Sequence, residues 1–190
     1  MATSPSSTQS GHAGRFYETF ATFLCSLKIS EHDIFAVRPD EIDEPFNTLL
    51  VHSRNMTPTL EQFVGCRIKL AVLRSEHRRD VLLRQVLLLM ENFRRTPLVL
   101  GNIKINLNNL PESARALVLD GVIPFGTILR EEQIEHQNEP AGFFGVRLSE
   151  PLSNYFGAHS AQVTYGRYRN ISAGNKATLA QVMEILSPLS

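Results

Sequence analysis

The chain has 190 residues, and its 19 basic and 19 acidic side chains give a formal net charge of zero at pH 7. A balanced charge argues against binding to a phosphate backbone, which needs an excess of basic residues. The two cysteines are not in a CxxC motif and no apolar run is long enough to span a bilayer, which excludes a disulfide framework, a zinc knuckle and a membrane span. We therefore predict a cytoplasmic protein with no nucleic-acid and no membrane partner.

Residues 1–13 are rich in Ser, Thr, Ala and Gly and lack the basic and apolar segments of a signal peptide, so we expect a disordered tail there. Residues 14–190 are long enough for one domain with a substantial core, and no internal repeat indicates a second domain.

The first third of the chain predicts helices and loops. Apolar residues recur at three- and four-residue steps over 14–28, as in an amphipathic helix. The acidic, proline-containing segment 38–45 is expected to be a surface loop, and a helix or extended segment follows at 46–52. Thr57 before Pro58 marks the start of a further helix.

The rest of the chain is dominated by expected strands, at 67–74, 81–90, 98–107, 143–148, 161–171 and 177–186. A charged loop, 75–80, joins the first two, and Gly174-Asn175 marks the turn of the last hairpin. Helices are expected at 109–120 and 127–137. This order predicts an α+β fold with a mainly antiparallel sheet of about six strands and inserted helices.

The segment 81–90 is the most apolar run in the chain, and it holds one full charge, Arg84. In a strand, Arg84 shares one face with apolar neighbours such as Val86 and Leu88. A guanidinium group stays ionised, and burying it without a partner is costly. Either a nearby carboxylate neutralises Arg84, or the site receives an anionic ligand in a mostly apolar pocket. The sequence leaves both readings open.

Sequence motifs for common catalytic chemistry are absent. The chain has no GxSxG, HExxH, GxxxxGKS or strand-linked GxGxxG motif, and its six histidines show no metal-ligand spacing. We therefore expect no metal and no cofactor.

Five short segments occur in an order that resembles the chorismate pyruvate-lyase family and its relatives: Asn55-Met-Thr-Pro-Thr-Leu-Glu61, Asp80-Val-Leu-Leu-Arg-Gln-Val86, Ile105-Asn-Leu-Asn-Asn-Leu-Pro111, Ile123-Pro-Phe-Gly126 and Arg167-Tyr-Arg-Asn-Ile-Ser172. The resemblance implies a six-stranded antiparallel sheet with a ligand enclosed beneath two helical flaps. It also implies a reaction that releases pyruvate from chorismate and leaves 4-hydroxybenzoate, with no cofactor.

The same resemblance implies site residues. Arg84 would clamp the substrate carboxylate as a catalytic residue. Met56, Thr57, Phe125 and Gly126 would line the pocket or its flaps.

The family's essential glutamate lies on its last strand. A gapless alignment places that position near Gln181, whereas a slightly longer hairpin places it at Glu184, and we favour Glu184. Glu184 would lie on an apolar face and act with Arg84 in binding and proton handling. If Gln181 fills the position as a substrate-binding residue, no carboxylate is left to carry the proton. The facing of the nearby Arg169 depends on a strand register that the sequence does not fix.

We predict a cofactor-independent lyase acting on a small carboxylated ring substrate, with chorismate as the best candidate. One alternative is a biosynthetic cyclase or dehydratase for a polyketide-like intermediate on the same fold. The other is a non-catalytic ligand-binding module, because this fold also forms the effector-binding half of some transcription regulators. The expected partner is a small anionic or cyclic metabolite, and a homodimer is left open.

Overall fold

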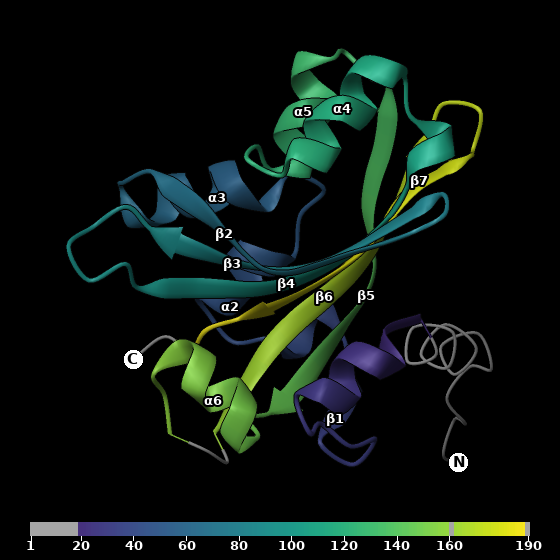
Figure 1. Ribbon diagram of the computed structural model, residues 1–190. Coiled ribbons are helices and arrows are strands. Elements are labelled where there is room, and N and C mark those ends of the chain that lie inside the picture. The colour runs from purple at the N-terminus through teal and green to yellow at the C-terminus, as the bar shows by residue number, and fades with distance from the viewer. Residues whose placement is uncertain (1–18, 160–161, 189–190) are drawn as a thin grey trace.

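The computed structural model describes residues 19–159 and 162–188 (Figure 1). Seven strands in this part of the chain form one antiparallel sheet with the order β1-β5-β6-β7-β4-β3-β2. The strands are β1 (Ile34–Val37), β2 (Ile68–Arg78), β3 (Val81–Met90), β4 (Pro97–Asn106), β5 (His136–Arg147), β6 (Val163–Ala173) and β7 (Thr178–Leu186). The tail expected at 1–13 lies outside the described residues.

Helices cover both faces of the sheet (Figure 1). They are α2 (Phe46–Leu50), α3 (Met56–Val64), α4 (Glu112–Asp120), α5 (Phe125–Glu131) and α6 (Glu150–Phe156), with 3-10 turns η1 (Pro39–Glu41) and η2 (Leu107–Asn109) and a first helix described over 19–26. None of the helices in 19–159 and 162–188 is long and apolar enough to cross a membrane.

Two layers of core follow from the alternation of side chains along each strand. On one face, called here the α3/α5 face, the sheet packs under α2 to α5, with residues such as Leu88, Val99 and Ile105 in the core. On the other, the α6 face, Leu100 and Met183 pack against α6 and the first helix. The α+β fold with a mainly antiparallel sheet is therefore confirmed.

The sheet has one strand more than predicted, because β1 pairs with β5 at the edge. Strand β1 has only four residues and is followed by an Arg-Pro pair, so its sequence pattern is too short to indicate a strand. Helix α6 was also not predicted, although its sequence carries end signals. Ser149 caps it by accepting a hydrogen bond from the amide of Leu152, and Gly157 ends it with a φ of 63°.

Two predicted loops are strand. Strand β2 continues into the charged segment 75–80 as far as Arg78 and pairs with β3 on both sides of a register shift between Val72 and Arg74, so that 79–80 form the turn. Strand β5 runs through Pro140 and Gly142, where a loop was expected, and the register with β6 shifts between these two residues. A bulge there lets a strand include a proline, which has no amide hydrogen to give to the ladder. The helix expected at 127–137 is shorter than predicted. It ends at Glu131, and the chain enters β5 at His136.

Gly166 on β6 permits the close approach of β7. A Cβ at this position would lie 2.5 Å from the carbonyl oxygen of Glu184 and would overlap the ring of Phe144. Any side chain at this position would therefore force the two central strands apart or displace the ring.

Gly166→Ala is expected to destabilise the protein by about 1–3 kcal/mol, because overpacking a tight site costs that much. Gly174→Ala is the matched control, since a Cβ there would meet Glu135 at an ordinary 3.5 Å. Urea denaturation followed by circular dichroism measures both changes. Equal losses for the two variants would contradict the tight contact at Gly166.

Candidate ligand-binding site

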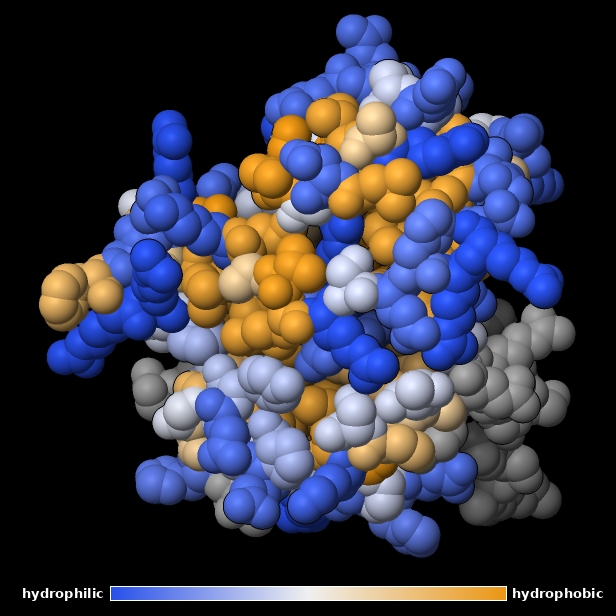
Figure 2. All heavy atoms as spheres, in the orientation of Figure 1, coloured by the Kyte–Doolittle hydropathy of each residue, from blue (hydrophilic) through white to orange (hydrophobic). Residues whose placement is uncertain are grey.

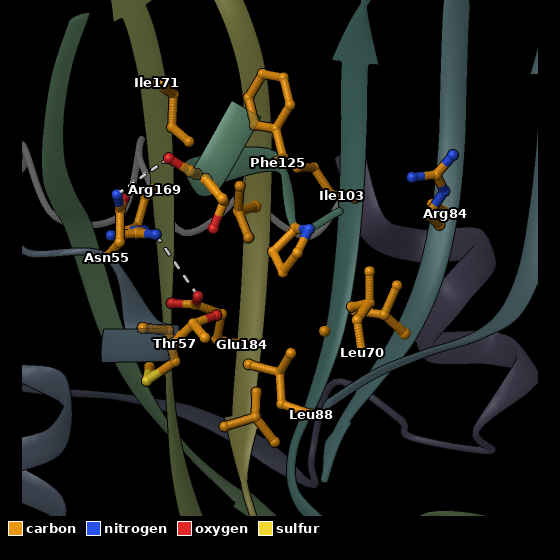
Figure 3. A pocket seen from close by; sticks show the side chains of 18 of the residues that line it. Asn55, Thr57, Leu70, Arg84, Leu88, Ile103, Phe125, Arg169, Ile171 and Glu184 are labelled. Atoms are coloured by element: carbon orange, nitrogen blue, oxygen red, sulfur yellow. Dashed lines mark hydrogen bonds and ion pairs between the residues drawn. The ribbon is translucent and has the colours of Figure 1, made fainter. Parts of the chain in front are cut away.

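A cavity of about 110 Å³ lies between the α3/α5 face of the sheet and the starts of helices α3 and α5 (Figure 3). One water needs only about 15 Å³, so the space suits a small organic molecule. Aliphatic side chains such as Leu88, Ile103 and Val182 form much of its floor, and Pro124 and Phe125 lie over them. Figure 2 shows that hydrophobic side chains also gather on the outer surface between α3 and the α4–α5 pair.

Six of the seven residues predicted from the sequence line this cavity: Met56, Thr57, Arg84, Phe125, Gly126 and Glu184. Gln181 does not. It lies one position out of phase with Val182 and Glu184 on β7, and its amide donates instead to Oδ1 of Asn170, at 3.4 Å. The last strand therefore brings Glu184 to the cavity, and Gln181 faces the other side of the sheet.

Arg84 enters the cavity wall from β3 and is only 6% exposed. Its Nη2 donates a 2.6 Å hydrogen bond to the carbonyl oxygen of Val118, in the last turn of α4. That end of a helix carries partial negative charge, which compensates the cation only in part. Gly121, which ends α4, leaves room for the guanidinium, because a Cβ there would lie 3.3 Å from Nη2.

No carboxylate compensates Arg84 in the part of the chain that the structure describes. None lies within the 4.0 Å that defines an ion pair, and burial lowers the pKa of the guanidinium with no charged neighbour opposing that shift. Its Nε is buried without a hydrogen-bond partner. The proposed internal partner, Glu184, pairs with other residues. Of the two readings that the sequence left open, the geometry therefore favours an anionic ligand.

Glu184 is held by two arginines of the neighbouring strand. Arg167, its direct partner in the β6–β7 register, donates from Nε to Oε2 at 2.6 Å, and Nη2 of Arg169 lies 3.6 Å from Oε1. Burial alone would raise the pKa of Glu184, but Arg167 and Arg169 outweigh burial and lower this pKa below its ordinary value. Glu184 is therefore a fixed carboxylate and is poorly suited to carry a proton.

Arg167 also fixes the loop between α2 and α3. It is fully buried, and its Nη1 donates to the carbonyl oxygens of Leu50, at 2.8 Å, and His52, at 3.0 Å. Nη1 of Arg169 donates to the carbonyl oxygen of Arg54 at 3.1 Å. These bonds tie the loop to the sheet and so place the start of α3 over the cavity.

Asn55 joins three elements at the edge of the cavity. Its side-chain oxygen accepts a 2.8 Å hydrogen bond from Asn138 on β5, and its Nδ2 lies 3.5 Å from the carbonyl oxygen of Gly126 on α5. Gly126 is needed here because a Cβ would lie 2.9 Å from Cγ of Asn55. Asn55 also borders an open polar groove of about 640 Å³, so it separates the cavity from that groove.

The sequence analysis missed Arg167 and Asn55 as site-forming residues. Two arginines at alternate positions, Arg167 and Arg169, share one strand face, and that spacing is visible in the sequence. Which face they share is visible only from the register with β7.

No protein-family model and no curated protein matches the chain. Solved structures do match, at low sequence identity. PhnF from Mycobacterium smegmatis has a TM-score of 0.57 and 10% identity over 73% of this chain and 65% of that one. The effector domain of the same protein gives 0.53 and 9%, over 73% and 91%. A "possible transcriptional regulator YydK" from Bacillus subtilis gives 0.52 and 10%, over 88% and 82%.

These similarities show a shared fold. The chain spans 65% of the length of the PhnF chain that it matches. The fold predicted from the sequence is thus one found in transcriptional regulators, and the comparisons do not show membership of the chorismate pyruvate-lyase family.

The prediction of an enzyme is wrong. The similar structures include an effector domain and a possible transcriptional regulator, which contradicts the prediction of a lyase that forms pyruvate and 4-hydroxybenzoate. The prediction of no nucleic-acid partner is not supported, because proteins of this fold include transcriptional regulators. Glu184 is ion-paired with Arg167 and Arg169 and not with Arg84.

Glu184→Gln is expected to destabilise the protein by about 3–5 kcal/mol, because it leaves two buried arginines without their carboxylate. Urea denaturation at pH 7 measures the loss. The matched control is Glu131→Gln, whose carboxylate is exposed and whose loss is expected to be below about 0.5 kcal/mol. A loss for Glu184→Gln as small as the control's would contradict the structural role.

His52 is expected to make stability fall between about pH 6.5 and pH 4. Its Nε2 lies 2.8 Å from the carbonyl oxygen of Leu49 and its Nδ1 lies 3.3 Å from Arg167, so the neutral ring fits with the proton on Nε2. Burial and Arg167 lower the pKa of His52 to about 4. The unfolded chain, with a histidine pKa of about 6.5, binds a proton in this window while the folded chain does not, which favours unfolding as pH falls.

The measurement is urea denaturation of the wild type and of His52→Gln at pH 7 and pH 5. We expect the wild type to lose more stability than the variant over this interval. Equal losses would show that His52 is not the group responsible.

Proposed function

We propose that this domain is a non-catalytic receptor for a small carboxylate-bearing molecule, held by Arg84 in the cavity beneath α3 and α5. The observation that carries the proposal is the burial of Arg84 in an apolar wall with no carboxylate partner among the side chains that the structure describes. A ligand carboxylate would supply the missing charge and accept the unused Nε–H.

The walls of the cavity support the same proposal. Apolar side chains exclude water, which strengthens a charge-assisted hydrogen bond, and they give a ring or alkyl group a surface to pack on. The roof, made by Met56, Thr57, Phe125 and Gly126, would contact the ligand from the side opposite the sheet. Gln181 has no part in this proposal.

We further propose that ligand binding is the input of a regulatory protein, by analogy with the effector domain of PhnF and the other regulators of this fold. Helices α3 and α5 would carry the signal, because they form the roof and are linked through a long Asn55–Gly126 hydrogen bond. Cytoplasmic location and a homodimer remain predictions.

The first test uses benzoate, a single ring with one carboxylate, and its uncharged analogue benzamide. Thermal-shift assays and isothermal titration calorimetry are expected to show binding of benzoate only. Arg84→Gln is expected to lose about 2–5 kcal/mol of benzoate binding free energy, because it removes the charged partner from a buried site. Arg74→Gln, at an exposed position of β2 that does not line the cavity, is the control and is expected to keep binding.

The unliganded Arg84→Gln protein distinguishes a ligand site from a structural one. Because Arg84 is buried without a carboxylate, its neutral variant is expected to be at least as stable as the wild type. Marked unfolding of Arg84→Gln, or benzoate binding that is unchanged by it, would contradict the proposal.

A further inference from the structure

Arg84 and Arg169 lie at the two ends of one row across the sheet. Arg84 pairs with Ile103, Ile103 pairs with Val182, and Val182 pairs with Arg169. Residues in such a row point to the same face, and all four line the cavity. Three strand spacings of about 4.8 Å place the two arginine Cα atoms about 14 Å apart. Figure 3 shows Arg84 and Arg169 on opposite sides of the cavity, with Ile103 and Phe125 between them.

The two arginines share the same unmet requirement. Arg84 is 6% exposed and Arg169 is 4% exposed, and in both the Nε is buried without a hydrogen-bond partner. Their other nitrogens are partly occupied, by the carbonyl of Val118 for Arg84 and by Arg54 and Glu184 for Arg169. Buried donors are normally paired, so two unpaired donors on one cavity indicate two places for an acceptor.

The buried charges near the cavity also leave a net charge of plus two. Among the side chains whose burial the structure describes, the buried ionised ones are Arg84, Arg167, Arg169 and Glu184, which is three positive charges against one negative charge. Arg167 and Glu184 compensate each other at 2.6 Å. The excess of two positive charges therefore belongs to Arg84 and Arg169, the residues with a free Nε.

We propose that the ligand is a short dicarboxylate, with one carboxylate on Arg84, the other on Arg169, and its carbon skeleton on Ile103 and Val182. This inference rests on the proposed function and adds the second anchor. The cavity has a volume of about 110 Å³, which leaves room for only a few atoms between the two carboxylates. The carbon skeleton must therefore be short.

The test is isothermal titration calorimetry at pH 7.5 with straight-chain dicarboxylates from butanedioate to octanedioate, each beside the monocarboxylate of the same length. We expect one dicarboxylate to bind at least about tenfold more tightly than its monocarboxylate, a difference of about 1.4 kcal/mol. Arg169→Gln is expected to remove this advantage and leave monocarboxylate affinity unchanged, whereas Arg84→Gln lowers both. Arg74→Gln, an exposed position on β2 outside the cavity lining, is the control and is expected to change neither.

The outcomes separate this inference from the proposed function. Monocarboxylate binding that depends on Arg84, with no gain for any dicarboxylate, would overturn the second anchor and keep the receptor. Absence of all carboxylate binding would overturn both. If Arg169→Gln does not fold, Arg169→Lys keeps the charge near Glu184 but lacks Nε, and an undiminished dicarboxylate advantage in that variant would overturn the inference.

Discussion

The structure depends on the ion pair between Arg167 and Glu184 at the centre of the sheet. Arg167 is fully buried, so its charge must be compensated completely, and Glu184 compensates it from the opposite position on the next strand. Arg167 also donates hydrogen bonds to the carbonyl groups of Leu50 and His52, which fixes the loop before α3. Breaking such a pair leaves an uncompensated buried charge, which costs several kcal/mol. The roof of the cavity is therefore held in place by an interaction that lies beneath it.

Three arginines on one face of the sheet have different roles because their surroundings differ. Arg167 has its carboxylate and its carbonyl groups, and it holds the structure together. Arg84 and Arg169 are nearly as buried, but both line the cavity and each has an Nε without a hydrogen-bond partner. A protein that only needed stability would gain from apolar residues at such positions. Two buried arginines at one cavity are what a binding site for an anion requires.

The same geometry explains why resemblance to an enzyme family did not carry over to enzyme chemistry. A proton-transfer residue needs a carboxyl group whose pKa lies near the working pH and whose oxygens can reach the substrate. Arg167 and Arg169 lower the pKa of Glu184 and occupy its oxygens. The short segments that resemble the family lie in helix starts, a turn and the strands β3 and β6, so they predict the fold, whereas function depends on the site built on it.

The sequence alone determined six of the seven strands in the described part of the chain, and what each of the six places on one face. The alternation in 81–90 put Arg84 beside Val86 and Leu88, and the same rule put Glu184 beside Val182, because side-chain direction has a period of two within any strand. The loop assigned to 75–80 was too long and the loop at 140–142 was wrong, since pairing with a neighbour extends a strand through charged residues and through a bulge at Pro140. Only the tertiary structure decided that Glu184 meets Arg167 instead of Arg84, and that Arg84 and Arg169 share a row. Those partners come from different strands, and the register between strands is set by long-range packing and bulges, which no local pattern records.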